Sequence, residues 1–255
     1  GGQNTALGES ALISNTTASN NTAVGKSALE ANTTGSANTA VGSISLDANT
    51  TGSSNNAFGR AALGANTTGS DNDAFGHNAL AANTTGASNV AMGHEALYNN
   101  TTASNNTAIG LAALNANTTG DSNTGVGSGA GENITTGTNN VLVGMNAGAH
   151  HINLSTGSNN ILVGKYTDTS ATNSANQIVI GYNANSAGDN TVTIGKEHGS
   201  GTRIYNTYTS NATWTHSSDE RFKKEITTNT DAGLDFINDL RTVTFKWKAK
   251  SEIDK

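Results

Sequence analysis

The sequence predicts an all-β repeat protein, a parallel β-solenoid or β-roll built from coils of 17 residues. Three observations predict this fold class. The phrase Asn-x-Ala-apolar-Gly recurs at a fixed interval, and a period of this length is typical of stacked repeats. The apolar position of the phrase is never polar in any copy. One repeat is too short to bury its own apolar side, so neighbouring repeats must stack to form a continuous core.

The asparagine that opens each phrase marks the start of a coil. When strands stack in parallel, identical residues lie above one another at about 4.8 Å. We therefore expect the asparagine side chains to form an amide ladder, as stacked asparagines do in cross-β structures. The ladder row is Asn4, Asn21, Asn38, Asn55, Asn72, Asn89, Asn106, Asn123 and Asn140.

Each coil is expected to begin with a short strand, such as Thr39, Ala40 and Val41, which Gly42 ends. Successive side chains of a strand point to opposite faces, so the apolar residue points away from the preceding alanine. We expect this apolar row to be the inner stack of the solenoid. The row is Leu7, Val24, Val41, Phe58, Phe75, Met92, Ile109, Val126 and Val143.

An Ala-Leu segment follows most of the strands. Alanine and leucine favour helix, and the few residues available allow one helical turn and no longer helix. We expect the leucines of this segment to form a second buried stack. An Asn-Thr-Thr-Gly sequence then closes many of the coils, for example at 32–35. We expect its asparagine and glycine to supply the positive φ angles of a tight turn.

The chain divides into four predicted regions. Residues 1–131 form the 17-residue repeat solenoid, and 132–198 form a β-roll with lengthened strands and coils of 14–20 residues. Residues 199–216 are a connector with strand character, and 217–255 are a small α+β segment. In that segment we expect a helix over 231–240 and a strand over 242–248. Because Gly1 and Gly2 open in the middle of a repeat, we expect the chain to be a piece of a longer protein.

Composition and charge restrict the function. A net charge of −6 with 13% charged residues disfavours binding to nucleic acid, which needs clustered lysine or arginine. No apolar run approaches the roughly 20 residues that span a bilayer, so we expect no membrane insertion. The chain has no cysteine, so packing must stabilise it. Ordering the backbone costs about 1–2 kcal/mol of conformational entropy per residue, and one narrow core buries too little apolar surface to offset this cost. We therefore expect a homotrimer, in which three chains pack on a common axis.

Residues 176–195, NQIVIGYNANSAGDNTVTIG, contain Val/Ile-x-Ile-Gly strands separated by small-residue turns. This pattern resembles the head repeat of trimeric autotransporter adhesins. The resemblance implies a trimeric, left-handed parallel β-roll. The 17-residue repeats share its strand but carry three extra residues and the Ala-Leu turn, so the resemblance covers 176–195 alone.

Residues 218–226, SDERFKKEI, precede the predicted helix and a VTFKWK strand. This arrangement resembles the self-cleaving intramolecular chaperone of phage tail spikes and fibres, peptidase family S74. The resemblance implies trimerisation of a fibre, followed by cleavage between serine and aspartate. Carried over to this chain, Ser218 is the nucleophile, Lys223 is the partner that takes its proton, and the bond before Asp219 is cut.

The alternative for Ser218 and Asp219 is that they cap a short helix. The chain ends at Lys255, short of a whole chaperone domain. We therefore expect self-cleavage in the full-length parent protein rather than in this chain.

Other polar residues were weighed as ligand sites. His77 and His94 share one repeat position, but they lack a third ligand type, so we expect a solvated row, no metal site and no cofactor. His150 and His151 lie in the one coil enlarged by three residues, where an insertion marks either a receptor-contact loop or a tolerated bulge. Scattered aspartates are interpreted as turn residues rather than calcium ligands. They are Asp47, Asp71, Asp73 and Asp121.

These observations predict a piece of a phage-type tail fibre or a related adhesin, located outside the cell on a virion or cell surface. Rows of Asn, Thr and Ser would attach it to a host or prey cell through a surface glycan or another receptor. One alternative is a purely structural shaft without a ligand. Another is a monomeric solenoid whose threonine columns bind ice or another ligand. An enzyme acting on external substrates is disfavoured, because the repeats carry no paired carboxylates at consistent places.

Overall fold

The computed structural model describes residues 2–196, 203–207 and 215–216, all within the first of two compact units, Gly1–Ser217 and Ser218–Lys255. The described residues form strands and turns without a helix, so none of them forms an apolar helix of membrane-spanning length. The strands are β1 (Thr5–Leu7), β2 (Thr22–Val24), β3 (Thr39–Val41), β4 (Asn56–Phe58), β5 (Asp73–Phe75), β6 (Val90–Met92), β7 (Thr107–Ile109), β8 (Thr124–Val126), β9 (Val141–Val143), β10 (Ile161–Val163), β11 (Ile178–Tyr182), β12 (Thr191–Lys196), β13 (Arg203–Thr207) and β14 (Thr215–His216).

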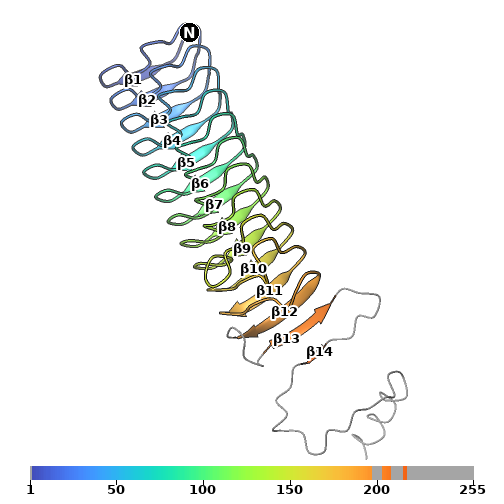
Figure 1. Cartoon of the computed structure of the whole chain (residues 1–255). Coiled ribbons are helices and arrows are strands. Elements are labelled where there is room, and N and C mark those ends of the chain that lie inside the picture. The colour runs from blue at the N-terminus through green and yellow to red at the C-terminus, as the bar shows by residue number, and fades with distance from the viewer. Residues whose placement is uncertain (1, 197–202, 208–214, 217–255) are drawn as a thin grey trace, which may run out of the picture. The chain divides into compact units, whose positions relative to one another are not determined.

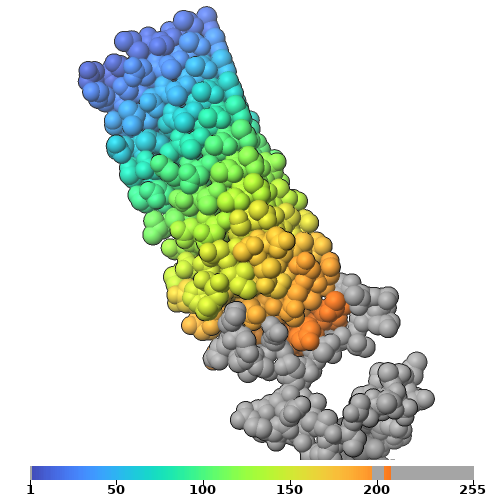
Figure 2. Space-filling view, in the orientation of Figure 1, coloured from blue at the N-terminus to red at the C-terminus, as the bar shows by residue number. Residues whose placement is uncertain are grey.

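The strands form one 14-stranded sheet in chain order, and β1 to β12 run parallel to one another (Figure 1). Each residue pairs with its equivalent in the next coil, as Val24 does with Val41. In the space-filling view, the coils follow one another in chain order and their atoms pack closely (Figure 2). The predicted all-β parallel solenoid is therefore confirmed. The helix predicted over 231–240 and the strand predicted over 242–248 lie outside the described residues.

Coil length changes while the strand register is kept. Val141 pairs with Ile161, Ile161 with Ile178, and Ile178 with Val192. The successive spacings are thus 20, 17 and 14 residues, and the differences are taken up in the turns. β13 and β14, within the predicted connector, pair antiparallel instead and end the parallel order.

The inward face of the strands is the opposite of the predicted one. The apolar row is partly exposed, with 37% of Phe58 and 40% of Met92 accessible to solvent. The alanines in the middle of strands β2 to β7 are fully buried: Ala23, Ala40, Ala57, Ala74, Ala91 and Ala108. Strand alternation separates two faces but does not say which one meets the core. The core between the strands and the buried leucines is narrow, so the small residue points inward and the large one points outward.

The Ala-Leu segment forms no helical turn, contrary to the prediction. Ala61 and Leu63 have φ angles of 57° and 54°, which interrupt any helix. The Leu63 amide donates to Ala79 O of the next coil at 3.0 Å instead of bonding within its own segment. Hydrogen bonding between coils therefore overrides the local helix propensity. The predicted leucine stack is confirmed, since Leu29, Leu46, Leu63, Leu80, Leu97 and Leu114 are fully buried.

The Asn-Thr-Thr-Gly turn also differs from the prediction. Neither Asn66 nor Gly69 has a positive φ angle. A Cβ atom on Gly69 would instead collide with Gly86 O and with Oδ1 of Asn66. Glycine at Gly69 relieves the close approach of the next coil and does not serve a left-handed backbone, and Ala18 and Ala103 take the equivalent position in two other coils.

The core changes its composition after β8. The leucine row becomes Gly131 and Gly148, and the Asn-Thr-Thr-Gly asparagine becomes Ile134 and Leu154 in the same coils. Both of these apolar side chains are fully buried. A Cβ on Gly131 would lie 3.2 Å from Cδ1 of Ile134, so the new side chain fills the space that leucine leaves. Buried apolar side chains remain in the core while the repeat positions that supply them change.

Two glycines of one coil should respond in opposite ways to alanine. Gly59 has a φ of 137° and its Cβ would strike Gly76 O, so we expect Gly59→Ala to destabilise the fold by at least about 1–3 kcal/mol. Gly64 has no contact below 3.4 Å at its Cβ position, so Gly64→Ala should be neutral or stabilising by about 0.4–1 kcal/mol. Thermal unfolding followed by circular dichroism measures both. Equal midpoints for the two variants would contradict the close approach of the coils at Gly59.

Candidate functional site

The outward strand face carries two columns of side chains. The first column follows the ladder asparagine, and the second is the apolar row. In β3 to β5 the first column is polar, with Thr39, Asn56 and Asp73. From β9 to β12 it becomes Val141, Ile161, Ile178 and Val192. We call this surface, formed by both columns, the outward strand face.

The apolar row of the outward strand face continues from coil to coil. Phe58 pairs with Phe75, and Phe75 with Met92. The rings of Phe58 and Phe75 stack in parallel with centroids 4.9 Å apart. Further along this row, Val163, Ile180 and Ile194 are exposed, and Ile161 of the first column is exposed beside them. Single exposed apolar residues are ordinary, but a contiguous exposed stripe marks an interaction surface.

The nine ladder asparagines lie beside the strands, and all from Asn21 to Asn140 are fully buried. Asn72 illustrates their bonding. Its Nδ2 donates to Gly86 O at 2.9 Å, and its Oδ1 accepts from the Asn89 amide at 3.1 Å. The row continues through Asn160 to the Gln177 amide. These side chains hold neighbouring coils together and are not available to an external ligand.

A second asparagine ladder was not predicted. It consists of the Asn-Thr-Thr-Gly asparagines, and Asn83 Nδ2 donates to both Asn66 Oδ1 (2.9 Å) and Gly86 O (3.0 Å). The ladder ends at Asn117, whose Oδ1 has no hydrogen-bond partner, because Ile134 stands where the next asparagine would donate. The sequence predicts turn residues here, although the 17-residue spacing of these asparagines is the signal of a second ladder.

The two threonines that follow each of these asparagines have different environments. The Thr67 hydroxyl donates to Thr84 O at 3.0 Å and is partly buried. Thr68 is exposed. The asparagine of this Asn-Thr-Thr glycosylation pattern is buried, and its Nδ2 is bonded. One threonine column therefore contributes to the exposed polar surface, while the asparagines do not.

His77 and His94 stack with ring centroids 5.0 Å apart. The guanidinium Nη1 of Arg60 lies 3.0 Å from Nε2 of His77. A cation at this nitrogen occupies the position that a metal would need. His94 lies 4.0 Å from Glu95, its sequence neighbour.

The four aspartates that were weighed as calcium ligands lie at different places in the coil. Asp73 accepts from Asn56 on the outward strand face, and Asp121 accepts from the Ser104 amide. Burial raises the pKa of Asp47, and the nearby Glu30 charge adds to the rise. None of the four belongs to a group of three metal-ligating side chains within the described residues.

The structure describes the two histidines of the enlarged coil but not the predicted cleavage residues. His150 and His151 are exposed in the turn of the 20-residue coil. Ser218, Asp219 and Lys223, the predicted cleavage residues, lie outside the described part of the chain. Their geometry is therefore not described.

Residues 218–255 match the model of the peptidase S74 family, described as chaperone of endosialidase. No curated protein and no solved structure matches the chain. The family match confirms the resemblance expected for this segment. The β-solenoid and the family match together fit a tail-fibre-like structural protein with the start of an intramolecular chaperone domain.

Removal of one ladder side chain should weaken the solenoid. Asn72→Ala leaves the buried Asn89 amide without a partner, which costs about 1–3 kcal/mol, and it removes one of the two bonds to Gly86 O, which keeps Asn83 Nδ2. Thr68→Ala, at an exposed position in the preceding coil, is the control. Urea unfolding followed by circular dichroism should show a lower midpoint for Asn72→Ala alone. A midpoint equal to that of the control would contradict a stabilising ladder.

Proposed function

We propose that this chain forms a homotrimeric fibre that attaches a virion or cell to a host or prey cell surface. The observation that carries the proposal is the outward strand face, a continuous apolar stripe on the outside of a solenoid that already has its own core. The chaperone family of residues 218–255 supports the same proposal, since the family resemblance implies trimerisation of fibres.

Three copies can cover this stripe with closed symmetry. If the solenoids lie parallel around a threefold axis, the same coil of each chain lies at the same height, and each stripe meets its equivalents. The apolar rows then interdigitate coil by coil, from Phe58 to Ile194. More apolar surface would be buried between the chains toward β12, because both columns of the outward strand face are apolar there. This arrangement supplies the burial that the narrow alanine-leucine core of one chain lacks.

Polar columns outside the outward strand face would carry the attachment function. The exposed position before each ladder asparagine holds Ser54, Asp71, Ser88 and Asn105 in successive coils. The exposed threonines, such as Thr68, lie in a second column. Rows of hydroxyl and amide groups can hydrogen-bond the hydroxyls of a glycan. Attachment through such rows is our proposal for the partner.

Light scattering of the purified chain tests the trimer. We expect three times the chain mass of 25.8 kDa. The double variant Phe58→Glu and Phe75→Glu should fall toward the single-chain mass, because it would bring carboxylates of three chains together in an apolar interface. Tyr98→Glu is the control, since Tyr98 is an exposed aromatic residue outside the stripe. A monomeric wild-type chain, or a trimer that the double variant leaves intact, would contradict the proposal.

Glycan-array binding of the fluorescently labelled trimer tests attachment. Retention on a defined group of glycans supports the adhesive role. A trimer that retains none favours a structural shaft without a ligand. The buried asparagine ladders support this second candidate, because they show that the most regular side chains of the repeat serve cohesion between coils.

Self-cleavage is a further part of the proposal. In the full-length parent protein, Ser218 would act as nucleophile with Lys223 as its partner, and the bond before Asp219 would be cut. We expect mass spectrometry of the purified parent to show a product ending at Ser218, and Ser218→Ala to abolish it. Ser217→Ala is the matched control, since it removes a neighbouring hydroxyl. Cleavage that persists in Ser218→Ala would refute this assignment.

A further inference from the structure

The 20-residue coil between β9 and β10 contains a loop that no other described coil has. Its extra residues lie between Gly148 and Leu154, and the Leu154 amide donates to Gly148 O at 3.0 Å and closes the loop. The Gly148 amide in turn donates to Thr167 O of the next coil at 2.6 Å. The loop is therefore anchored at its base, and it carries His150 and His151 on its exposed side.

The next coil presents a buried carboxylate to this loop. Asp168 stands four residues after the strand-ending Gly164, a position that holds a buried leucine in the regular coils. Its backbone is fixed by a bond from the Asp168 amide to Ala184 O and by one from the Ser186 amide to Asp168 O. The side chain is 1% exposed. An aspartate at a core position that leucine usually fills requires a specific partner.

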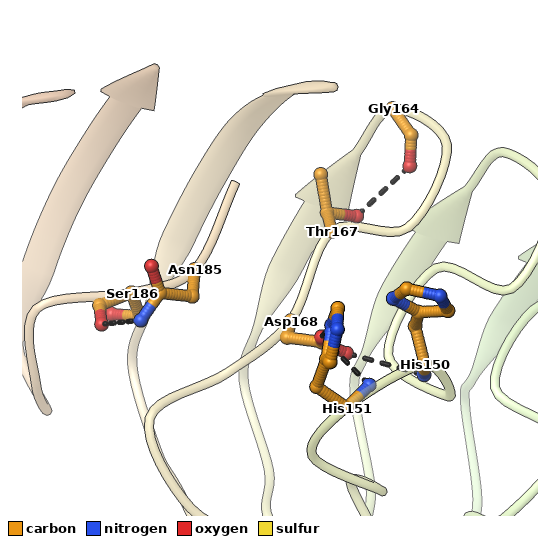
Figure 3. A network of polar contacts seen from close by, with 7 residues as sticks. All are labelled: His150, His151, Gly164, Thr167, Asp168, Asn185 and Ser186. Carbon is orange, nitrogen blue, oxygen red and sulfur yellow. Dashed lines mark hydrogen bonds and ion pairs between the residues drawn. The ribbon is translucent and has the colours of Figure 1, made fainter. Parts of the chain in front are cut away.

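The partners of the Asp168 carboxylate come from the loop between Gly148 and Leu154, which we call the histidine loop (Figure 3). Oδ1 accepts from the His150 amide at 3.2 Å, and Oδ2 accepts from the His151 amide at 3.0 Å. Nδ1 of the His151 ring lies 3.4 Å from Oδ2. The His150 ring stacks on Tyr166 with centroids 4.0 Å apart. Both imidazoles and the carboxylate thus meet at the mouth of the loop.

Within the described residues, no lysine or arginine forms an ion pair with the Asp168 carboxylate. Lys165 places its ammonium over the Tyr166 ring, 4.5 Å from the centroid. A buried carboxylate is costly unless a cation or a metal compensates it. Two backbone amides and the exposed His151 imidazole face this carboxylate. A divalent cation held by all three side chains would compensate the charge fully.

We propose that His150, His151 and Asp168 form a binding site for a zinc-like divalent transition metal ion. One nitrogen of each histidine and one carboxylate oxygen lie within 4.8 Å of one another. A tetrahedral zinc with bonds of about 2.0–2.2 Å separates its ligand atoms by roughly 3.3–3.6 Å, which the 3.4 Å His151–Asp168 distance already matches. Rotation of the exposed His150 side chain closes the remainder, and solvent supplies the fourth ligand.

The ligand types select the class of metal. Imidazole nitrogen suits zinc, copper, nickel and iron, whereas calcium and magnesium prefer oxygen ligands alone. The site is made by one chain and joins the histidine loop to the coil that follows it. A metal ion bound there would connect the 20-residue coil to the 17-residue coil that follows it. The inference does not depend on the trimer or on attachment.

His77 and His94 provide an internal comparison within the same solenoid. They are also a stacked histidine pair, but Arg60 contacts His77, and the described residues place no third metal-ligating side chain beside them. A chain that bound metal through any adjacent histidines would use both pairs. The proposed site predicts that only the pair beside Asp168 binds.

Titration of the whole chain, prepared without a histidine tag, with Co²⁺ and then Zn²⁺ tests the site. We expect visible Co²⁺ absorption of a nitrogen and oxygen site that saturates at one ion per chain, and its displacement by Zn²⁺. His150→Ala and His151→Ala should each weaken binding by at least about 10-fold, the lower bound known for loss of a supporting residue. The double variant His77→Ala and His94→Ala should bind as the wild type does.

The exposed histidines keep the test independent of folding. Asp168→Asn also should lose binding, but its circular dichroism must be compared with wild type, since a buried residue is changed. If it unfolds, the two histidine variants decide. Absence of saturable binding by the wild type overturns the proposal. So does wild-type affinity in both His150→Ala and His151→Ala, or loss of binding in the His77 and His94 variant.

Discussion

Every coil of this protein must place its backbone directly beside the equivalent backbone of the next, because hydrogen bonds between coils satisfy most of its peptide groups. The strand amides, the Leu63 amide and the Thr67 amide all donate to neighbouring coils rather than to their own. At about 4.8 Å between strands, little space separates one coil from the next. Glycine at Gly59 and Gly69 follows from this spacing, since a Cβ atom at either position would strike the next coil.

The same constraint explains why the polar residues of the repeat are buried. Two asparagine ladders run through the stack, and their side-chain amides bond across the coil boundary, as Asn83 does with Asn66 and Asn72 with the Asn89 amide. A buried amide is stable only where every coil supplies its partner. Where Ile134 interrupts the second ladder, Asn117 Oδ1 is left unpaired, and Ile134 and Leu154 place buried apolar side chains where the ladder would continue. The change in repeat composition is thus a change in what holds the coils together.

A narrow core also forces large apolar side chains outward. In β2 to β7 alanine occupies the inner strand position, and Phe58, Phe75 and Met92 form part of an exposed stripe that has the character of an interface. The fibre proposal rests on this stripe, while the metal proposal rests on Asp168 and the histidine loop. The stripe is built by the repeat itself, coil after coil. The cluster of Asp168 and the two histidines arises where the repeat is interrupted by the 20-residue coil.

The sequence by itself determined the parallel solenoid, its period, the leucine stack and the relation of 218–255 to the chaperone family, because a strict period and a local motif are visible in one dimension. Only the tertiary structure decided which strand face is inside, since alternation is symmetric between faces until the core width is known. It also decided that the Ala-Leu segment is not helical, because bonds between coils replace local ones. The juxtaposition of Asp168 with His150 and His151 could not be foreseen, since the insertion disrupts the very period by which positions in neighbouring coils are aligned.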